Sequence, residues 1–374
     1  MSAIADTSTP KRQTEPTLGT CDLSLLSSLD GRFARLRASF AIYGPEHAPC
    51  VVVLGGISAN RLAADWWAAQ VGPGRAIDTD RFRVLGIDFI DTLPEGWRGI
   101  TPHDQAVVLA GVLDALAIEC VEAIVGASYG GAVALSFAEK YRHRLRAALV
   151  LSMAHRPSPM ASAVRAVQRD LLRLGEELGC EARTVALARA LAVTTYRSEA
   201  EFALRFEGAA REVDGTWRLP VESYLRAQGE RFAARFDARR YRLLSESLDL
   251  HHVDPRRLRV PLYLLAVNED RLVPRADIEA LARASDASLT CLSSVYGHDA
   301  FLKEASAVGA WIVSALADAS GGDGRDDLWR ESLAPVHSEG GRPCEPVQGD
   351  ALSRPAACRN PHPVHGEELS RPAA

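Results

Sequence analysis

The sequence lacks any long apolar run, and its first residues are not hydrophobic. In 374 residues, no apolar stretch approaches the roughly 20 residues that a membrane-spanning helix needs. The segment from Met1 to Pro16 is polar and contains no apolar core of the kind found in secretory signals. We therefore expect no membrane association, no export and a cytoplasmic location.

Paired cysteines and an excess of charge are also missing. Seven cysteines are dispersed along the chain, without the Cys-x-x-Cys or Cys–His spacings of zinc sites. We expect reduced thiols, no metal and no cofactor.

The net charge of −5 argues against a nucleic-acid partner. Hydrophobic residues make up 47% of the chain, which is enough for a substantial core.

The most informative segment that is present is Gly-Ala-Ser-Tyr-Gly-Gly at 126–131. It follows an apolar run and precedes small residues at helical spacing. A strand, then Gly-x-Ser-x-Gly, then a helix is the context of a nucleophile elbow. The chain reverses there so sharply that a side chain at Gly126 or Gly130 would collide with neighbouring backbone. The pattern predicts that Ser128 is a raised, reactive nucleophile.

Apolar runs alternate with helical patterns over much of the chain, which predicts an α/β fold with a mostly parallel sheet covered on both faces. An early antiparallel strand is expected at 33–42. The expected buried strands are 51–54, 83–88, 121–125, 147–151 and 262–267.

Between about 160 and 252, buried-strand runs give way to Ala, Leu, Arg and Glu at helical spacing. This change predicts a helical lid inserted into the α/β core. Beyond 320, Gly, Pro and charged residues dominate, which is typical of disorder. We divide the chain into a disordered N-terminus at 1–18, the first part of the core at 19–156, the lid at 157–252, the second part of the core at 253–318 and a disordered tail at 319–374.

A serine nucleophile needs a histidine base, and the histidine needs an orienting carboxylate. On this kind of sheet the chain order is Ser, then Asp or Glu, then His. His298 fits because it follows a strand-like run at 288–295 and begins the last helix. Asp270 follows the strand at 262–267, and we choose it as the acid. Spacing alone leaves Glu269 open, and either carboxylate is also placed to cap the next helix.

The negative oxygen formed during acyl transfer needs two backbone N–H donors. One is expected from Tyr129, directly after the nucleophile. The other is expected from Ile57, in the Gly-Gly-Ile-Ser-Ala segment that follows the first buried strand. The two glycines of that segment are equally compatible with an ordinary turn.

Further segments resemble the homoserine O-acyltransferases of methionine biosynthesis, which have the α/β-hydrolase fold with a helical lid. Their order and spacing are those of the family over roughly residues 33–315, so the set is far more specific than the elbow alone. The similar segments are 66–67, 71–82, 126–131, 167–169, 195–198, 221–225, 235–237 and 296–302.

The resemblance implies a ping-pong reaction in which Ser128 takes an acyl group from acyl-CoA and passes it to the hydroxyl of L-homoserine. It also implies that Asp299 binds the ammonium group of the acceptor and that Arg197 binds its carboxylate. Without the resemblance, a helix N-terminal acid and a surface ion pair are the simpler interpretations of these two residues. Family members are commonly homodimers through the lid helices.

The sequence departs from the family pattern in one segment, and this departure bears on which acyl donor the protein uses. Most family members have a His-Ala-Leu-Thr-like segment where this chain has Gly-Gly-Ile-Ser-Ala-Asn at 55–60, and this version resembles a subgroup associated with succinyl transfer. A succinyl group carries a carboxylate, for which Arg165 and Arg169 are candidates because i and i+4 share a helix face. Ordinary solvated arginines are the alternative for both.

Several functions therefore stay open beside succinyl transfer from succinyl-CoA to L-homoserine. The donor can instead be acetyl-CoA, and the acceptor can be L-serine. An esterase or thioesterase shares the same three catalytic residue types. A binding module without activity is a third class, which the intact Ser, Asp and His disfavour.

Overall fold

The computed structural model describes residues 15–320 of the chain. Most of the two segments for which we predict disorder, 1–18 and 319–374, lies outside the described residues. The first strand, β1, begins at Thr17, so regular structure starts two residues before the position where we placed the start of the core.

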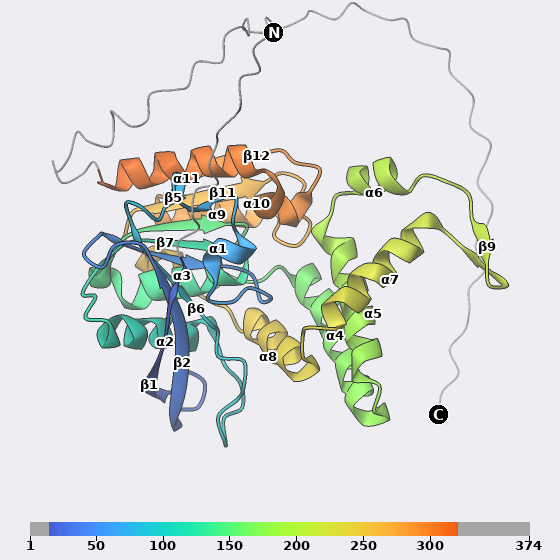
Figure 1. Cartoon of the computed structure of the whole chain (residues 1–374), viewed down its shortest axis with the longest axis horizontal. Coiled ribbons are helices and arrows are strands. Elements are labelled where there is room, and N and C mark those ends of the chain that lie inside the picture. The colour runs from blue at the N-terminus through green and yellow to red at the C-terminus, as the bar shows by residue number, and fades with distance from the viewer. Residues whose placement is uncertain (1–14, 321–374) are drawn as a thin grey trace, which may run out of the picture. The chain divides into compact units, whose positions relative to one another are not determined.

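An eight-stranded sheet forms the centre of the protein, in the order β1-β2-β6-β3-β7-β8-β11-β12 (Figure 1). Its strands are β1 (Thr17–Leu26), β2 (Phe33–Tyr43), β3 (Cys50–Leu54), β6 (Arg83–Ile87), β7 (Val121–Ala127), β8 (Leu145–Leu151), β11 (Leu262–Val267) and β12 (Ser288–Leu292). The strands from β6 to β12 run parallel, and β1 and β2 add an antiparallel edge. The predicted mostly parallel sheet is confirmed.

The central strands are buried on both sides because helices cover both faces. All five residues of β3 are buried, as expected for an apolar run without alternation. Helices α2 (Pro102–Ala115) and α3 (Tyr129–Lys140) lie on one face, and α11 (Ala305–Ser320) lies on the other. Helix α9 (Arg275–Ser285) connects β11 to β12.

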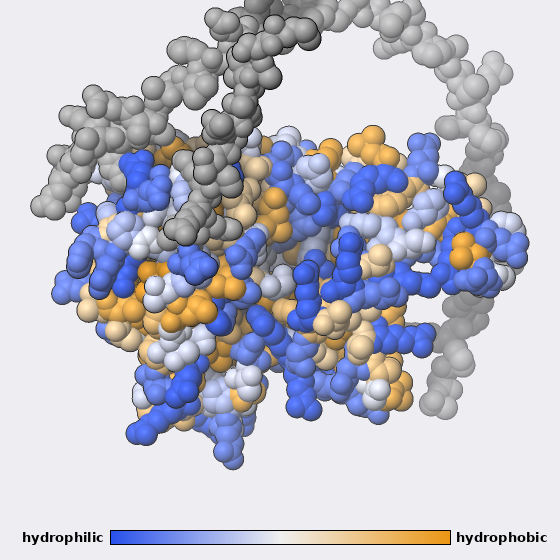
Figure 2. Space-filling model, in the orientation of Figure 1, coloured by the Kyte–Doolittle hydropathy of each residue, from blue (hydrophilic) through white to orange (hydrophobic). Residues whose placement is uncertain are grey.

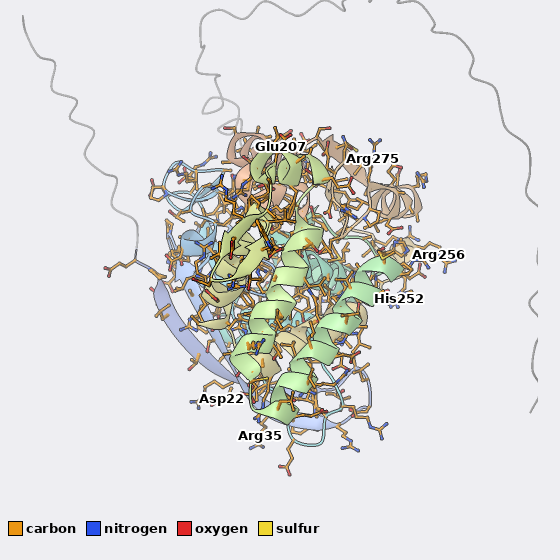
Figure 3. The ribbon with its side chains drawn as sticks, turned by 90° about the vertical axis from the view of Figure 1, so that its right-hand side faces the viewer. Asp22, Arg35, Glu207, His252, Arg256 and Arg275 are labelled. Atoms are coloured by element: carbon orange, nitrogen blue, oxygen red, sulfur yellow. The ribbon has the colours of Figure 1, made fainter. Side chains whose placement is uncertain are left out.

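The predicted lid lies between β8 and β11. It consists of α4 (Pro159–Leu178), α5 (Glu181–Tyr196), α6 (Glu199–Phe206), α7 (Pro220–Ala233) and α8 (Ala238–Asp249). Helices α4 and α5 run side by side, as Figure 3 shows from the lid side. The lid also contains a hairpin that we did not predict, formed by β9 (Arg211–Val213) and β10 (Thr216–Arg218).

Smaller elements complete the described chain: α1 (Ala63–Trp66), the strand pair β4 (Val71–Gly72) and β5 (Ile77–Asp78), α10 (Ala300–Lys303) and three short 3-10 turns, η1 (Arg142–Arg144), η2 (Pro255–Arg257) and η3 (Gly297–Asp299). The last helical segment is broken at Glu304, between α10 and α11. That carboxylate accepts a hydrogen bond from Ser294 Oγ at 2.6 Å, which ties the break to the loop after β12.

Among the described residues, no single helix is long and apolar enough to cross a membrane, and only the bent pair Gly297–Lys303 and Ala305–Ser320 passes that test together. Its two halves meet at 77°. The face of the molecule in Figure 2 is mostly hydrophilic, with small apolar patches scattered over both the core and the lid.

Candidate active site

The elbow has the geometry that the glycines predict. Ser128 lies between β7 and α3 with a φ of 53°, a strained value for a residue with a side chain. A Cβ atom at Gly126 would lie 2.4 Å from the Gly130 carbonyl oxygen, and one at Gly130 would lie 2.2 Å from the Leu54 carbonyl oxygen. Only glycine fits at either position, so the tight turn holds the Ser128 side chain above the sheet edge.

The structure brings Ser128, His298 and Asp270 into one hydrogen-bonded chain. His298 Nε2 lies 2.9 Å from Ser128 Oγ, and His298 Nδ1 lies 2.7 Å from Asp270 Oδ2. The three residues follow β7, β12 and β11, whose carboxyl ends meet at one edge of the parallel sheet. This geometry suits a serine nucleophile, a histidine base and an orienting carboxylate.

The hydrogen bonds of Asp270 and Glu269 show which of these two carboxylates faces His298. Asp270 Oδ1 accepts hydrogen bonds from the Leu272 and Val273 N–H groups at 2.8 and 2.9 Å, which leaves Oδ2 for His298. The Glu269 carboxylate instead accepts from the Ser294 N–H at 2.7 Å. Glu269 therefore supports the loop after β12, whereas Asp270 faces the histidine.

The surroundings of His298 fix its position and raise the pKa of its imidazole. Gly297 before it has a φ of +54°, and a Cβ there would lie 2.8 Å from the Tyr196 carbonyl oxygen. Burial opposes protonation of His298, but the adjacent Asp270 carboxylate and its hydrogen bond outweigh burial and raise the pKa of His298 above its usual value. The negative charge of Asp299 acts in the same direction.

The two expected oxyanion donors flank the serine. Tyr129 is the first residue of α3, where backbone N–H groups have no acceptor within the helix. Ile57 lines the same pocket as Ser128, and a Cβ atom on the preceding Gly56 would be 4.0 Å from Ser128 Cβ. The loop after β3 is therefore close enough for the Ile57 N–H to face a tetrahedral intermediate on Ser128.

Arg197 and Asp299 lie against each other beside the histidine. Arg197 Nε is 3.0 Å from Asp299 Oδ2, and its Nη1 is 3.1 Å from Glu201 Oε1. All three side chains are largely buried. A pair of opposite charges adjacent to His298 matches the two charged groups of an amino acid, which can lie across the pair and exchange partners with it.

A small pocket of about 40 Å³ lies directly over Ser128, between the sheet edge and the lid. Its walls are contributed by the loop after β3 and by helices α4, α5 and α8. The lining residues are Ile57, Ser128, Val164, Arg165, Gln168, Thr195, Tyr196, Tyr241, Ser245, Leu248 and Leu272. The lid thus closes over the serine with a mixture of apolar, hydroxyl and cationic side chains.

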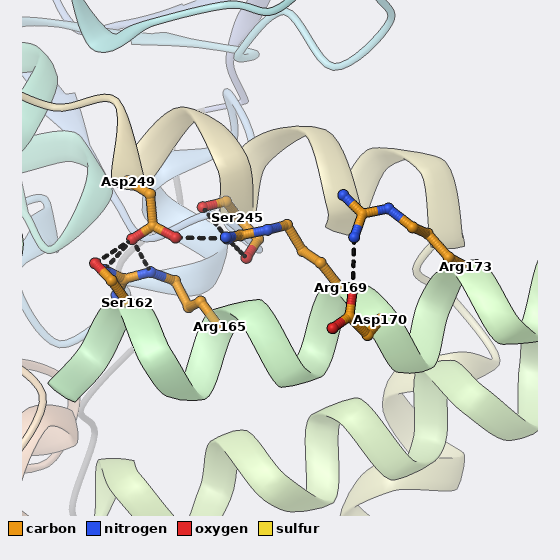
Figure 4. Close-up of polar contacts among 7 residues, drawn as sticks. All are labelled: Ser162, Arg165, Arg169, Asp170, Arg173, Ser245 and Asp249. Atoms are coloured by element: carbon orange, nitrogen blue, oxygen red, sulfur yellow. Dashed lines mark hydrogen bonds and ion pairs between the residues drawn. The ribbon is translucent and has the colours of Figure 1, made fainter. Parts of the chain in front are cut away.

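Arg165 and Arg169 share a face of α4, as their spacing predicts, and converge on Asp249 at the end of α8 (Figure 4). Arg165 Nε lies 2.8 Å and Arg169 Nη1 2.5 Å from the Asp249 carboxylate. Arg165 lines the pocket over Ser128, whereas Arg169 turns towards Ser245. Two guanidinium groups against one carboxylate leave a net positive charge in this cluster.

Three residues that position the site were missed from the sequence: Glu201, Tyr196 and Asp249. Glu201 binds Arg197, Asp249 binds Arg165 and Arg169 of α4, and the Tyr196 ring lies 5.8 Å from the His298 ring. Glu201 follows Arg197 by four residues, a spacing that signals an ion pair. Nothing in the sequence pairs Asp249 with residues 80 positions away. In residues 15–320, no group of three or more His, Cys, Asp or Glu side chains is arranged to hold a metal ion.

The chain is similar over most of its length to curated acyltransferases. The homoserine O-succinyltransferase of Xanthomonas campestris pv. campestris is 41% identical over 291 residues, covering 75% of this chain and 79% of that protein. The homoserine O-acetyltransferase of Clavibacter michiganensis subsp. michiganensis is 30% identical over 344 residues, covering 76% and 88%. No protein-family model matches the chain.

Solved structures show the same fold at low sequence identity. The homoserine O-acetyltransferase from Bacillus anthracis superposes with a TM-score of 0.72 at 16% identity, covering 80% of this chain and 98% of that one. Esterase E22 reaches 0.71 at 16% identity, covering 80% and 100%. These likenesses establish the α/β-hydrolase fold, and the sequence identity to the curated relatives shows that the chain belongs to the homoserine O-acyltransferase family.

Proposed function

We propose that this protein transfers a succinyl group from succinyl-CoA to the hydroxyl of L-homoserine through an acyl-Ser128 intermediate. The observation that carries the proposal is the Arg197–Asp299 pair beside the hydrogen-bonded Ser128, His298 and Asp270. An esterase needs no such pair, whereas an amino-acid acceptor needs a cation for its carboxylate and an anion for its ammonium group. The name of the Xanthomonas relative supports the same reaction.

In the first half-reaction, Ser128 Oγ attacks the thioester carbonyl while His298 Nε2 takes the hydroxyl proton. The N–H groups of Ile57 and Tyr129 stabilise the negative charge on the carbonyl oxygen by donating hydrogen bonds to it. The carbon–sulfur bond then breaks, and His298 returns the proton to the departing thiolate, so that CoA leaves as the free thiol. Asp270 holds the histidine in the tautomer that can accept the proton.

In the second half-reaction, His298 removes the proton from the hydroxyl of L-homoserine, whose oxygen attacks the acyl-serine. The bond to Ser128 Oγ breaks, and the serine recovers its proton from His298. Arg197 and Asp299 hold the acceptor so that its hydroxyl reaches the ester before water does. The small, covered pocket over Ser128 limits competing hydrolysis.

The decisive experiment is a matrix of succinyl-CoA and acetyl-CoA against L-homoserine and L-serine, with release of free thiol as the readout. Succinyl transfer predicts rapid thiol release that needs both succinyl-CoA and L-homoserine, with O-succinylhomoserine as the product. Thiol release that is independent of the amino acid would identify a thioesterase instead. Failure of a serine-directed phosphonate to label Ser128 would support a binding module without activity.

Preference for succinyl over acetyl is assigned to the net positive charge of the Arg165, Arg169 and Asp249 cluster. Arg165 is the member that lines the pocket, so it is the one placed to meet a carboxylate on the acyl group. Arg165→Met is expected to lower the ratio of kcat/KM for succinyl-CoA over acetyl-CoA by about tenfold or more. Arg173→Met is the matched control, because Arg173 is an exposed arginine of α4 paired with Asp170 (Figure 4). An unchanged ratio in Arg165→Met and Arg169→Met excludes this role.

We also propose that two copies associate through the lid. Met160, Val167 and Leu174 recur every seven residues along the exposed side of α4, and Leu178 continues the line. Exposed apolar residues at this spacing are typical of a helix that packs against another helix. Light scattering is expected to give a dimer mass for the native protein and a monomer mass for the double variant Val167→Glu, Leu174→Glu. A monomer at micromolar concentration in the native protein would contradict the proposal.

A further inference from the structure

Arg189, in α5, differs from the other arginines near the site because it has no acidic partner. Arg165, Arg169 and Arg197 each bind a carboxylate. In the described part of the chain, no Asp or Glu lies within ion-pair distance of Arg189. Its half-buried guanidinium instead lies over two aromatic rings, 4.7 Å from the Phe232 centroid and 5.1 Å from the Tyr196 centroid. A partly desolvated cation that has no carboxylate partner can still bind an anion.

Tyr241, in α8, provides an unsatisfied polar group near this cation. Its side chain is 1% exposed, and its hydroxyl has no hydrogen-bond partner among the described residues. Buried hydroxyls are normally paired, because an unpaired one costs free energy. Tyr241 lines the pocket over Ser128. Its ring also packs edge-on against Phe232 at 5.4 Å, the ring over which Arg189 lies.

The positive charge of Arg189 affects the pKa values of two tyrosine hydroxyls, those of Tyr241 and of Tyr196. Burial raises the pKa of both the Tyr196 and the Tyr241 hydroxyl, and the positive charge of Arg189 opposes the rise in each case. Tyr196 in turn lies against His298 and lines the same pocket. Tyr196 and Tyr241 therefore line the pocket next to Ser128, and Arg189 lies behind this wall, over the Tyr196 ring.

We propose that Arg189 and the Tyr241 hydroxyl form an anion-binding subsite for the acyl donor. The ligand atom is an anionic oxygen, supplied either by the terminal carboxylate of the acyl group or by a phosphate of the coenzyme. The guanidinium contributes charge and N–H donors, and the tyrosine contributes an O–H donor. This proposal rests on the proposed function, in that the donor is an acyl-CoA.

The test uses Arg189→Gln and Tyr241→Phe, which keep most of the packing volume, and Arg183→Gln as the control. Arg183 is an exposed arginine of the same helix. For each protein, kcat/KM is measured with succinyl-CoA, acetyl-CoA and the succinyl thioester of N-acetylcysteamine, which has no phosphate. L-Homoserine is saturating, and its KM is measured separately. Thermal unfolding reports any general loss of structure.

Arg189→Gln is expected to lower kcat/KM for succinyl-CoA by about 10- to 100-fold, and Tyr241→Phe by about 3- to 10-fold, with Arg183→Gln unchanged. Loss with both succinyl donors but not with acetyl-CoA identifies the acyl carboxylate as the ligand. Loss with both coenzyme donors but not with the short thioester identifies a coenzyme phosphate. Changes below twofold for all donors, equal losses for all three, or a change confined to the KM of L-homoserine would each overturn the subsite.

A binding measurement tests the subsite independently of the proposed reaction. Titration calorimetry with succinate and with CoA is carried out on the native protein and on Arg189→Gln. Weaker binding of either compound to the variant supports the subsite even if the native protein transfers no acyl group to L-homoserine. Equal binding of both compounds to the two proteins overturns it, and the transfer assay judges the reaction independently.

Discussion

At the scale of single residues, the proposed catalysis depends on how the carboxylate of Asp270 is held. Asp270 is fixed by two backbone N–H groups and has one oxygen left for His298. This arrangement leaves the imidazole little freedom to rotate. In the proposed mechanism it also stabilises the imidazolium that forms when Ser128 loses its proton. The neighbouring Glu269 has the same charge but a different partner, so the two residues can be tested against each other.

Asp270→Asn is expected to lower kcat/KM by about 10³- to 10⁴-fold, because the amide favours the wrong histidine tautomer. The pH profile provides a second readout. Protonated His298 cannot accept the Ser128 proton, so native activity should fall as the pH drops through an apparent pKa that lies above that of a free histidine. Loss of the negative charge should move that midpoint to lower pH. Glu269→Gln should stay within about threefold of native kcat/KM, and equal losses in the two variants would contradict the assignment.

A second residue-scale prediction concerns the elbow. Gly130→Ala places a methyl group 2.2 Å from the Leu54 carbonyl oxygen, which is backbone and cannot move aside. We expect the free energy of unfolding to fall by about 3 kcal/mol or more and the activity to be lost. Gly56→Ala is the matched comparison, since its nearest neighbour is 4.0 Å away. Urea unfolding measures both, and similar stabilities would show that the turn tolerates a side chain.

At the scale of elements, α4 and α8 are joined by the cluster around Asp249 (Figure 4). Burial opposes ionisation of Asp249, but hydrogen bonds from Arg165, Ser162 and Arg169 outweigh it and lower the pKa of this carboxyl. Because the folded-state pKa is below the unfolded value, the charged form stabilises the fold above about pH 3.8. That contribution is lost as the pH falls towards the folded-state pKa.

Asp249→Ala is therefore expected to lower the free energy of unfolding at pH 7 by about 2–4 kcal/mol, since it leaves two largely buried arginines without an anionic partner. The difference from the native protein should shrink as the pH is lowered from 5 to 3. Asp170→Ala removes an exposed partner of Arg173 and should cost at most about 0.5 kcal/mol. Urea unfolding at several pH values measures these quantities, and a pH-independent difference would rule out the ionic explanation.

Elements with strong periodicity were predicted well, and short ones were not. The buried strands and the helical lid follow directly from apolar runs and helical spacing. The strand at Thr17–Leu26 was missed because it is a largely exposed edge strand, in which only Leu25 is buried. The hairpin around Asp214 and Gly215 was missed although Asp-Gly is a strong two-residue turn signal. Its strands have three residues each and lie outside the core, so no apolar pattern marks them.

At the scale of the whole molecule, the lid is connected to the core by two chain segments that bind each other. His251 Nε2 donates to the Ala154 carbonyl at 3.0 Å, and the Val253 N–H donates to the His155 carbonyl at 3.0 Å. Burial lowers the pKa of His251 to about 3, so the ring is neutral at ordinary pH. These contacts lock the entry and exit of the lid together, which helps to keep the lid closed over Ser128.

His251→Leu removes one of these bonds at similar volume. We expect the ratio of hydrolysis to acyl transfer to rise about fivefold, as for the loss of one hydrogen bond of ~1 kcal/mol, because a looser lid admits water to the acyl-enzyme. Free thiol released in excess of acylated L-homoserine measures the ratio. His252→Leu is the control, since His252 is exposed at the neighbouring position (Figure 3). An unchanged ratio in His251→Leu would show that the lid stays closed without this bond.

The sequence alone determined the features that depend on local pattern. The elbow at Ser128, the order of nucleophile, acid and base, and the helical insertion follow from glycine placement, apolar runs and spacing, since these dictate backbone geometry over a few residues. Tertiary structure decided which charges meet. It turned Asp270 rather than Glu269 towards His298, joined Arg165 to Asp249 and left Arg189 beside aromatic rings. Such contacts join residues far apart in the chain and depend on how the lid packs on the sheet, a long-range arrangement that no local pattern encodes.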